Sequence, residues 1–67
     1  MDFILRHADN KDIVDVFENK QELFVFVQKI KNDFNTDNKD MTIKTLANSV
    51  GNCIEILKQF DYILELR

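Results

Sequence analysis

Apolar residues near the start of this chain of 67 residues fall into two short runs, residues 2–8 and 13–17, with a polar link between them. The β-branched side chains Ile13, Val14 and Val16 favour an extended strand. The link contains Asp and Asn, which tolerate the left-handed backbone of tight turns. The two runs therefore predict an N-terminal β-hairpin. Strict alternation in the second strand places Val14 and Val16 on the face opposite Ile13.

The next segment, residues 20–34, carries apolar side chains at helical spacing. Asn19, followed three residues later by Glu22, resembles a capping box at the start of this helix. The apolar stripe consists of Leu23, Phe26, Val27, Ile30 and Phe34. Phe24 and Val25 lie off the stripe, so they form either a second buried face or an exposed patch available to a partner.

A polar loop, residues 35–40, follows this helix, and Asp40 can cap the helix after it. The next helical stripe ends at Gly51, the only glycine of the chain, which suits the left-handed position that closes a helix. The members of this stripe are Ile43, Leu46, Ala47 and Val50. A further stripe consists of Cys53, Ile54, Leu57 and Phe60. The end of the chain, residues 62–67, alternates between apolar and mixed positions and predicts a third strand against the hairpin.

The same C-terminal half supports an alternative, a single helix over residues 41–66. Apolar residues recur there every seven positions, as in a helix-packing seam. The seam consists of Ile43, Val50, Leu57 and Leu64, with Leu46, Cys53 and Phe60 beside them. A helix with Gly51 in its interior costs about 1 kcal/mol, which the burial of such a seam can outweigh. The sequence leaves both alternatives open, and the seam would also support a homodimer.

These elements predict an α+β fold in one small domain, residues 1–67: an N-terminal β-hairpin, two or three helices and a C-terminal third strand, or the hairpin with one long C-terminal helix. Apolar residues make up 45% of the chain, and six Phe supply core material. A domain of this size buries only about 60% of the surface of its unfolded chain, so self-association is a reasonable source of extra stability.

The charge and the cysteine content narrow the functional classes. The formal net charge is −3, which disfavours non-specific contact with nucleic acid or anionic membranes. The N-terminal residues do not resemble a signal peptide, and no apolar run approaches a membrane span. One free cysteine is typical of a reducing compartment. We therefore expect a cytoplasmic protein.

Residues 43–60 resemble the helix-turn-helix family of DNA-binding proteins. Ala47, Gly51 and Leu57 match its spacing of a small residue, a turn glycine and a core residue. The resemblance implies a transcriptional regulator. Its DNA contacts would come from Lys44, Asn52 and Lys58. The sequence departs from the family at Asn52, where an apolar residue is usual, and in having one basic residue in the recognition helix.

The other candidate motifs do not indicate metal binding or catalysis. Residues 33–44 begin like a calcium loop, but the sixth position is Asn38 instead of Gly and the twelfth is Lys44 instead of Glu. His7 is the only histidine and has no nucleophile near it in sequence, and Cys53 lies on an apolar stripe. We therefore expect no catalytic residue, no metal site, no cofactor and no small-molecule substrate; the chain is predicted not to be an enzyme.

The remaining interpretation is a protein-binding module. Aromatic and aliphatic anchors with an acidic surround are typical of protein interfaces. The candidate interface residues are Phe24, Val25, Ile43, Val50, Leu57, Phe60 and Leu64. The sequence thus predicts a small acidic inhibitor, adaptor or regulator of another protein, of the kind that phages and mobile elements encode, with the DNA-binding regulator as the alternative.

Overall fold

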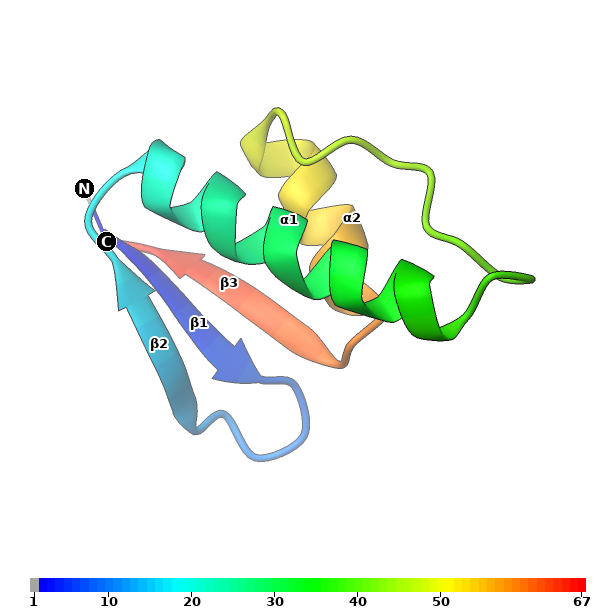
Figure 1. Cartoon of the computed structure of the whole chain (residues 1–67). Coiled ribbons are helices and arrows are strands. Elements are labelled where there is room, and N and C mark those ends of the chain that lie inside the picture. The colour runs from blue at the N-terminus through cyan, green and yellow to red at the C-terminus, as the bar shows by residue number, and fades with distance from the viewer. Residues whose placement is uncertain (1) are drawn as a thin grey trace.

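The computed structural model describes residues 2–67, which form a three-stranded sheet and two helices (Figure 1). In chain order the elements are β1 (Phe3–His7), β2 (Ile13–Phe17), α1 (Lys20–Asp37), α2 (Val50–Lys58) and β3 (Tyr62–Leu66). The predicted α+β fold, with an N-terminal hairpin, two helices and a C-terminal third strand, is confirmed.

The strand order is β2-β1-β3, and both pairings are antiparallel. The first strand therefore lies in the centre, and its residues Phe3, Ile4 and Leu5 are all buried. A central strand is enclosed by neighbours on both sides, which is why these three side chains are buried although β2 contains more apolar residues. The two later strands are both edge strands.

The pairing of β1 with β2 is irregular, which corrects the prediction of strict alternation. Leu5 lies opposite Asp15, but the next residue, Arg6, lies opposite Ile13. One extra residue, Val14, is thus inserted into β2 as a β-bulge. A bulge shifts the side chains that follow it relative to the pleat, so the predicted separation of Ile13 from Val14 does not apply.

The first helix begins as predicted at a cap on Asn19. Its side-chain Oδ1 accepts a hydrogen bond from the backbone N–H of Glu22 at 3.0 Å. The Glu22 carboxylate in turn accepts from the backbone N–H of Glu18 at 2.8 Å. The reciprocal bond thus reaches one residue further back than in a standard capping box. The helix extends to Asp37, three residues beyond the predicted end at residue 34.

Both helices pack on one face of the sheet (Figure 1), and the core lies between the two layers. The buried cluster consists of Phe3, Leu5, Phe17, Leu23, Val27, Ile43, Cys53, Ile56 and Leu57. Phe17 and Phe26 contact at a ring-centroid distance of 5.2 Å, and Phe34 meets Phe60 edge-on at 5.5 Å. The aromatic residues therefore join β2 and the end of α2 to the first helix.

The predicted helix over residues 41–50 is wrong, because residues 42–46 have no regular secondary structure and 47–49 form a bend. Two side chains of α1 hold this segment in place. Asn35 accepts a hydrogen bond from the backbone N–H of Ile43 at 2.7 Å and donates to the carbonyl of the same residue at 3.1 Å. The Nζ of Lys31, which is 7% exposed, donates to the carbonyl of Thr45 at 2.9 Å. These bonds satisfy backbone groups that a helix would otherwise pair.

The second helix begins at Ser49, whose Oγ accepts from the backbone N–H of Asn52 at 3.1 Å. The predicted cap at Asp40 is therefore wrong. Gly51 lies in the first turn of α2, has no positive φ, and a Cβ there would meet nothing within 4 Å. It neither closes a helix nor lies in the middle of one. The alternative of one helix over residues 41–66 is thus excluded.

The chain leaves α2 through a tight turn in which Asp61 adopts φ 60°, a left-handed conformation that Asp tolerates better than most residues. The carbonyl of Asp61 accepts from the backbone N–H of Ala8 at 2.8 Å, which ties the turn to the end of β1. Ile43, Leu57 and Leu64 come from a loop, a helix and a strand that face one core. Their seven-residue spacing therefore does not mark one helix; all three side chains face the core of one chain. Neither helix within residues 2–67 is long and apolar enough to cross a membrane.

Candidate protein-binding surface

The face of the sheet that the helices leave uncovered carries the principal candidate surface. Phe3 and Leu5 belong to the core beneath the helices, so their neighbours Ile4 and Arg6 point to the opposite side. Through the strand register, the residues opposite Ile4 are Val16 and Glu65. We call this side of the sheet the open face.

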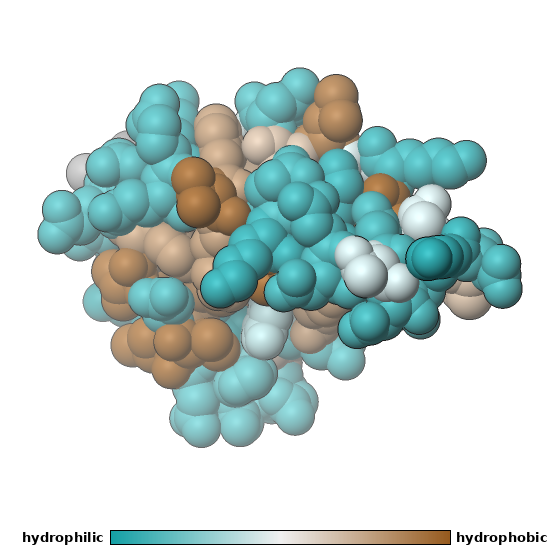
Figure 2. Space-filling view, viewed as in Figure 1, coloured by the Kyte–Doolittle hydropathy of each residue, from teal (hydrophilic) through white to brown (hydrophobic). Residues whose placement is uncertain are grey.

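The β2 half of the open face is apolar. Ile13 is 57% exposed, Val14 38% and Val16 46%. Ile4 is only 7% exposed although it lies outside the core cluster, so its strand neighbours cover it. Hydrophobic atoms gather over the part of the molecule occupied by β2 (Figure 2). We call Ile13, Val14 and Val16 the β2 patch.

The β3 side of the open face carries charged groups together with Ile63, which lies opposite Arg6. The Glu65 Oε1 atom lies 3.7 Å from the Arg6 guanidinium and 3.3 Å from Nε of Arg67. Neither guanidinium hydrogen bonds to this oxygen, which is buried. Arg6 on β1 also donates to the carbonyl of Lys11 at 2.8 Å, so its guanidinium lies between Glu65 and the hairpin turn. The open face thus carries exposed aliphatic groups along β2, and a charged cluster beside Ile63 along β1 and β3.

Acidic residues surround the β2 patch. Asp12 precedes the strand, Asp15 lies within it and Glu18 follows it, and all three are exposed. Within residues 2–67, the acids that form ion pairs are others, Glu55 and Glu65. Three carboxylates without an ion pair thus lie along the strand of the patch, and Arg6 of β1 lies opposite Ile13.

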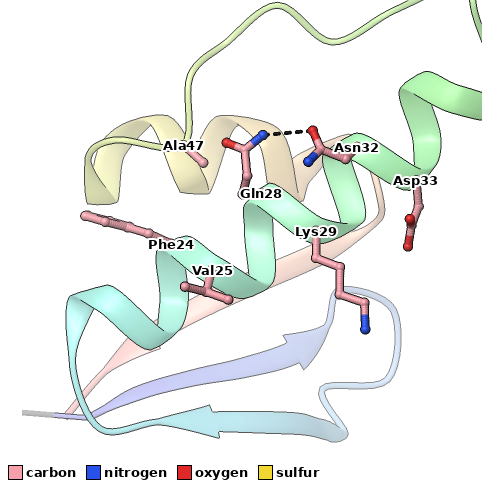
Figure 3. Close-up of a pocket in the computed structure, with 7 residues that line it drawn as sticks. All are labelled: Phe24, Val25, Gln28, Lys29, Asn32, Asp33 and Ala47. Atoms are coloured by element: carbon pink, nitrogen blue, oxygen red, sulfur yellow. Dashed lines mark hydrogen bonds between the residues drawn. The ribbon is translucent and has the colours of Figure 1, made fainter.

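A second surface lies along α1, where Phe24, Val25 and Ala47 line one end of a shallow hollow of about 540 Å³ (Figure 3). Polar side chains line the rest: Gln28, Lys29, Asn32 and Asp33. The Gln28 Nε2 donates to Oδ1 of Asn32 at 2.8 Å, so these two side chains are already satisfied by each other. Phe24 is half-buried against the core, whereas Val25 is 70% exposed.

The structure separates the seven predicted interface residues. Only Phe24 and Val25 line a common surface, the hollow on α1. Ile43 and Leu57 are buried in the core at 6% and 1% exposure. The remaining three, Val50, Phe60 and Leu64, are half-buried and pack against the same core. These five side chains therefore contribute to the fold of one chain.

The residues of the DNA-binding alternative do not lie on two adjacent helices, because residues 41–49 are not helical. Lys44 is exposed on the loop. Asn52 donates to Asn48 Oδ1 at 2.9 Å, and the Lys58 ammonium lies 3.9 Å from the Glu55 carboxylate. The helix-turn-helix geometry that the spacing indicated is therefore absent from residues 43–60.

The reactive side chains stand apart from one another. His7 is exposed at the end of β1, where its ring lies 5.5 Å from that of Tyr62. Cys53 is fully buried, and desolvation by burial raises the pKa of its thiol above the ordinary value. A group of His, Cys, Asp and Glu side chains able to hold a metal ion does not occur among residues 2–67.

Sequence reasoning missed the β2 patch, although its signal was visible. The strand IVDVF has apolar residues at both alternating positions, whereas a hairpin strand with one solvated face usually alternates with polar ones. Lys31 and Asn35 were also missed. They lie four residues apart on α1, a spacing that brings them to one face of the helix, but nothing local indicates that they bind a distant backbone.

Comparison with protein-family models, with curated protein sequences and with solved structures found no match for this chain.

Proposed function

We propose that this protein is a non-catalytic module that binds another protein through the β2 patch. The observation that carries the proposal is the exposure of Ile13 and Val16, which the strand register places on the face that no helix covers, with Val14 exposed between them. Exposed aliphatic groups that adjoin one another are typical of interaction sites. An inhibitor, adaptor or regulator acts in this way, by covering part of a partner's surface.

The charge of the patch indicates the chemistry of the partner. Asp12, Asp15 and Glu18 lie along the strand that carries the aliphatic groups. A partner surface with apolar contacts and basic residues around them would complement both features. Binding would then weaken as salt concentration rises, because exposed charges beyond about 8–10 Å are screened at physiological ionic strength.

The hollow on α1 is a weaker basis for the same function. Its apolar end is small, and Phe24 at that end is partly used by the core. Val25 is nevertheless the most exposed large aliphatic residue of α1. It therefore provides a matched control for the β2 patch, because both sites carry exposed valines.

Affinity capture from the cells that make the protein tests the proposal with three baits: wild type, the double variant Ile13→Asp/Val16→Asp, and Val25→Asp. Circular dichroism first establishes that all three are folded. We expect at least one protein to be retained by wild type and Val25→Asp and reduced tenfold or more on the double variant. Retention of the same proteins at the same level by all three baits would contradict the proposal.

A further inference from the structure

The two edges of the sheet differ in whether they can accept another strand. β1 lies in the centre, so β2 and β3 each leave one side without a partner (Figure 1). Unpaired N–H and C=O groups on an edge can pair with a strand of another chain, and proteins commonly block such edges. One of the two edges here is blocked, and the other is not.

The β2 edge is blocked by its own sequence. The Asp15 carboxylate accepts a hydrogen bond from the backbone N–H of Val16 at 2.8 Å. This amide lies on the edge strand and is no longer free to pair with a further strand. The bulge at Val14 also disturbs the regular ladder that an added strand would need.

The β3 edge is regular over its whole length. Its five residues pair with β1 without a register shift. Arg67 and Asp2 exchange backbone hydrogen bonds in both directions, so alternation directs the backbone groups of Ile63 and Glu65 toward β1. Those of Tyr62, Leu64 and Leu66 then point outward. Within the described part of the chain, no backbone or side-chain group hydrogen bonds to these outward groups.

We propose that β3 pairs antiparallel with β3 of a second copy of this chain, about a two-fold axis that passes between the two Leu64 residues. In this register Tyr62 lies opposite Leu66 of the second copy, and the reverse pair forms on the other side of the axis. All outward-pointing residues meet outward-pointing residues, which is the condition for a hydrogen-bonded antiparallel ladder. The strand is therefore complementary to itself in its backbone.

The side chains at and near the ends of the strand are complementary in the same register, while Ile63 lies opposite Glu65 of the second copy. Asp61, next to one end of β3, lies opposite Arg67 of the second copy, next to the other end, so two opposite-charge pairs form. Asp61 has no ion pair among residues 2–67, and Arg67, whose side chain is 66% exposed, would contact it in addition to Glu65 of its own chain, which lies 3.3 Å away. In this register the Tyr62 ring of the second copy would cover Leu66, which is 48% exposed in the single chain. Opposite-charge and aromatic–aliphatic cross-strand pairs both stabilise antiparallel ladders.

Charge variants test this register. Arg67→Glu and Asp61→Lys each place like charges at both ends of the self-paired strand, but a mixture of the two variants restores opposite charges at both ends. Light scattering coupled to size exclusion would be recorded for wild type, each variant and the equimolar mixture, over roughly 10 μM to 1 mM, the range in which small interfaces associate. We expect the mass of wild type and of the mixture to rise from 8.0 kDa toward twice that value, and each variant alone to stay at the lower value. A variant that merely misfolded would not recover on mixing.

Amide hydrogen exchange gives an independent readout. The amides of Tyr62, Leu64 and Leu66 are expected to exchange quickly in dilute wild-type protein and to gain protection as the dimer forms. A wild type that stays at 8.0 kDa throughout, with these amides unprotected, would overturn the proposal. So would dimers that form equally well in both single variants. Neither variant alters Ile13 or Val16, so failure here leaves the proposed binding through the β2 patch standing, and the reverse also holds.

Discussion

The two faces of the sheet contain similar aliphatic side chains but use them differently. On the covered face, Leu5 is fully buried beneath the helices. On the open face, Ile13 and Val16 keep about half of their surface in contact with solvent, at 57% and 46% exposure. A sheet that is solvated on one face usually carries polar side chains there. The apolar groups of the covered face therefore stabilise the fold, whereas those of β2 on the open face remain exposed and available to a partner.

The open face is itself divided between its strands. Its β3 half carries the Arg6, Glu65 and Arg67 cluster, in which each charge has an opposite neighbour within 4 Å. Its β2 half carries aliphatic groups with unpaired acids beside them. An interface centred on β2 would thus bury apolar surface and leave this charged cluster in place.

The largest expected effect comes from truncation on the covered face. Leu5→Ala removes a fully buried side chain and should lower the free energy of unfolding by about 2–5 kcal/mol, which is comparable to the whole stability of a domain of this size. Val16→Ala on the open face should cost well under half as much. Urea unfolding followed by circular dichroism measures both. Equal losses at the two positions would mean that the open face is also part of the core.

A smaller effect is expected in the irregular segment between α1 and α2, which contains Ile43. Asn35→Ala leaves the N–H and C=O of Ile43 without their partners, and should cost about 1–3 kcal/mol. Asn32→Ala on the same helix is the control, because its side chain is exposed and, among residues 2–67, hydrogen bonds to Gln28 alone. Thermal unfolding gives the difference. Similar melting temperatures for the two variants would show that the segment is not anchored by Asn35.

A still smaller effect, of opposite sign, is expected in α2. Gly51→Ala adds a methyl group into open space at a helical position and should stabilise the protein by about 0.4–1 kcal/mol, because the unfolded chain loses freedom. Ser49→Ala, two residues earlier, should destabilise it through loss of the helix cap. Both are measured by urea unfolding. A destabilising Gly51→Ala would show that the glycine is required where it stands.

The smallest effect is expected on the open face. Val16→Thr keeps the β-branched shape that suits a strand and replaces an exposed methyl group with a hydroxyl. The free energy of unfolding should change by less than about 0.5 kcal/mol, as for surface substitutions generally. The same change at the buried Val27→Thr is the contrasting control, since it places a hydroxyl in the core. Equal costs at the two positions would remove the distinction between the open face and the core.

The fold could be predicted where the signals were local. The hairpin and the first helix with its Asn19 cap follow from residues close together in sequence, whereas the third strand was one of two alternatives that the sequence left open. Residues 41–50 could not be predicted, because their conformation depends on Lys31 and Asn35, which bind backbone groups 14 and 8 positions away. The apolar spacing of these residues fits a helix, but Ile43 is instead buried from an irregular segment.

The candidate surface was predicted less well than the fold. Val25 was correctly seen to lie off the apolar stripe of its helix, and it is exposed. The heptad residues Ile43 and Leu57 were assigned to an interface because periodicity cannot distinguish a seam between chains from the core of one chain. Predicting the β2 patch requires knowing which face of the sheet the helices cover, and this depends on the whole fold.

The most direct test of the central claim is site-specific photo-crosslinking in the cells that make the protein. A photoreactive amino acid would replace Val16 in one version and Val25 in another, and the covalent adducts would be compared by mass spectrometry. The account predicts a discrete adduct with a second protein from position 16, much weaker from position 25, and reduced by high salt when repeated in lysate. Adducts from position 25 alone, or none from position 16, would contradict it.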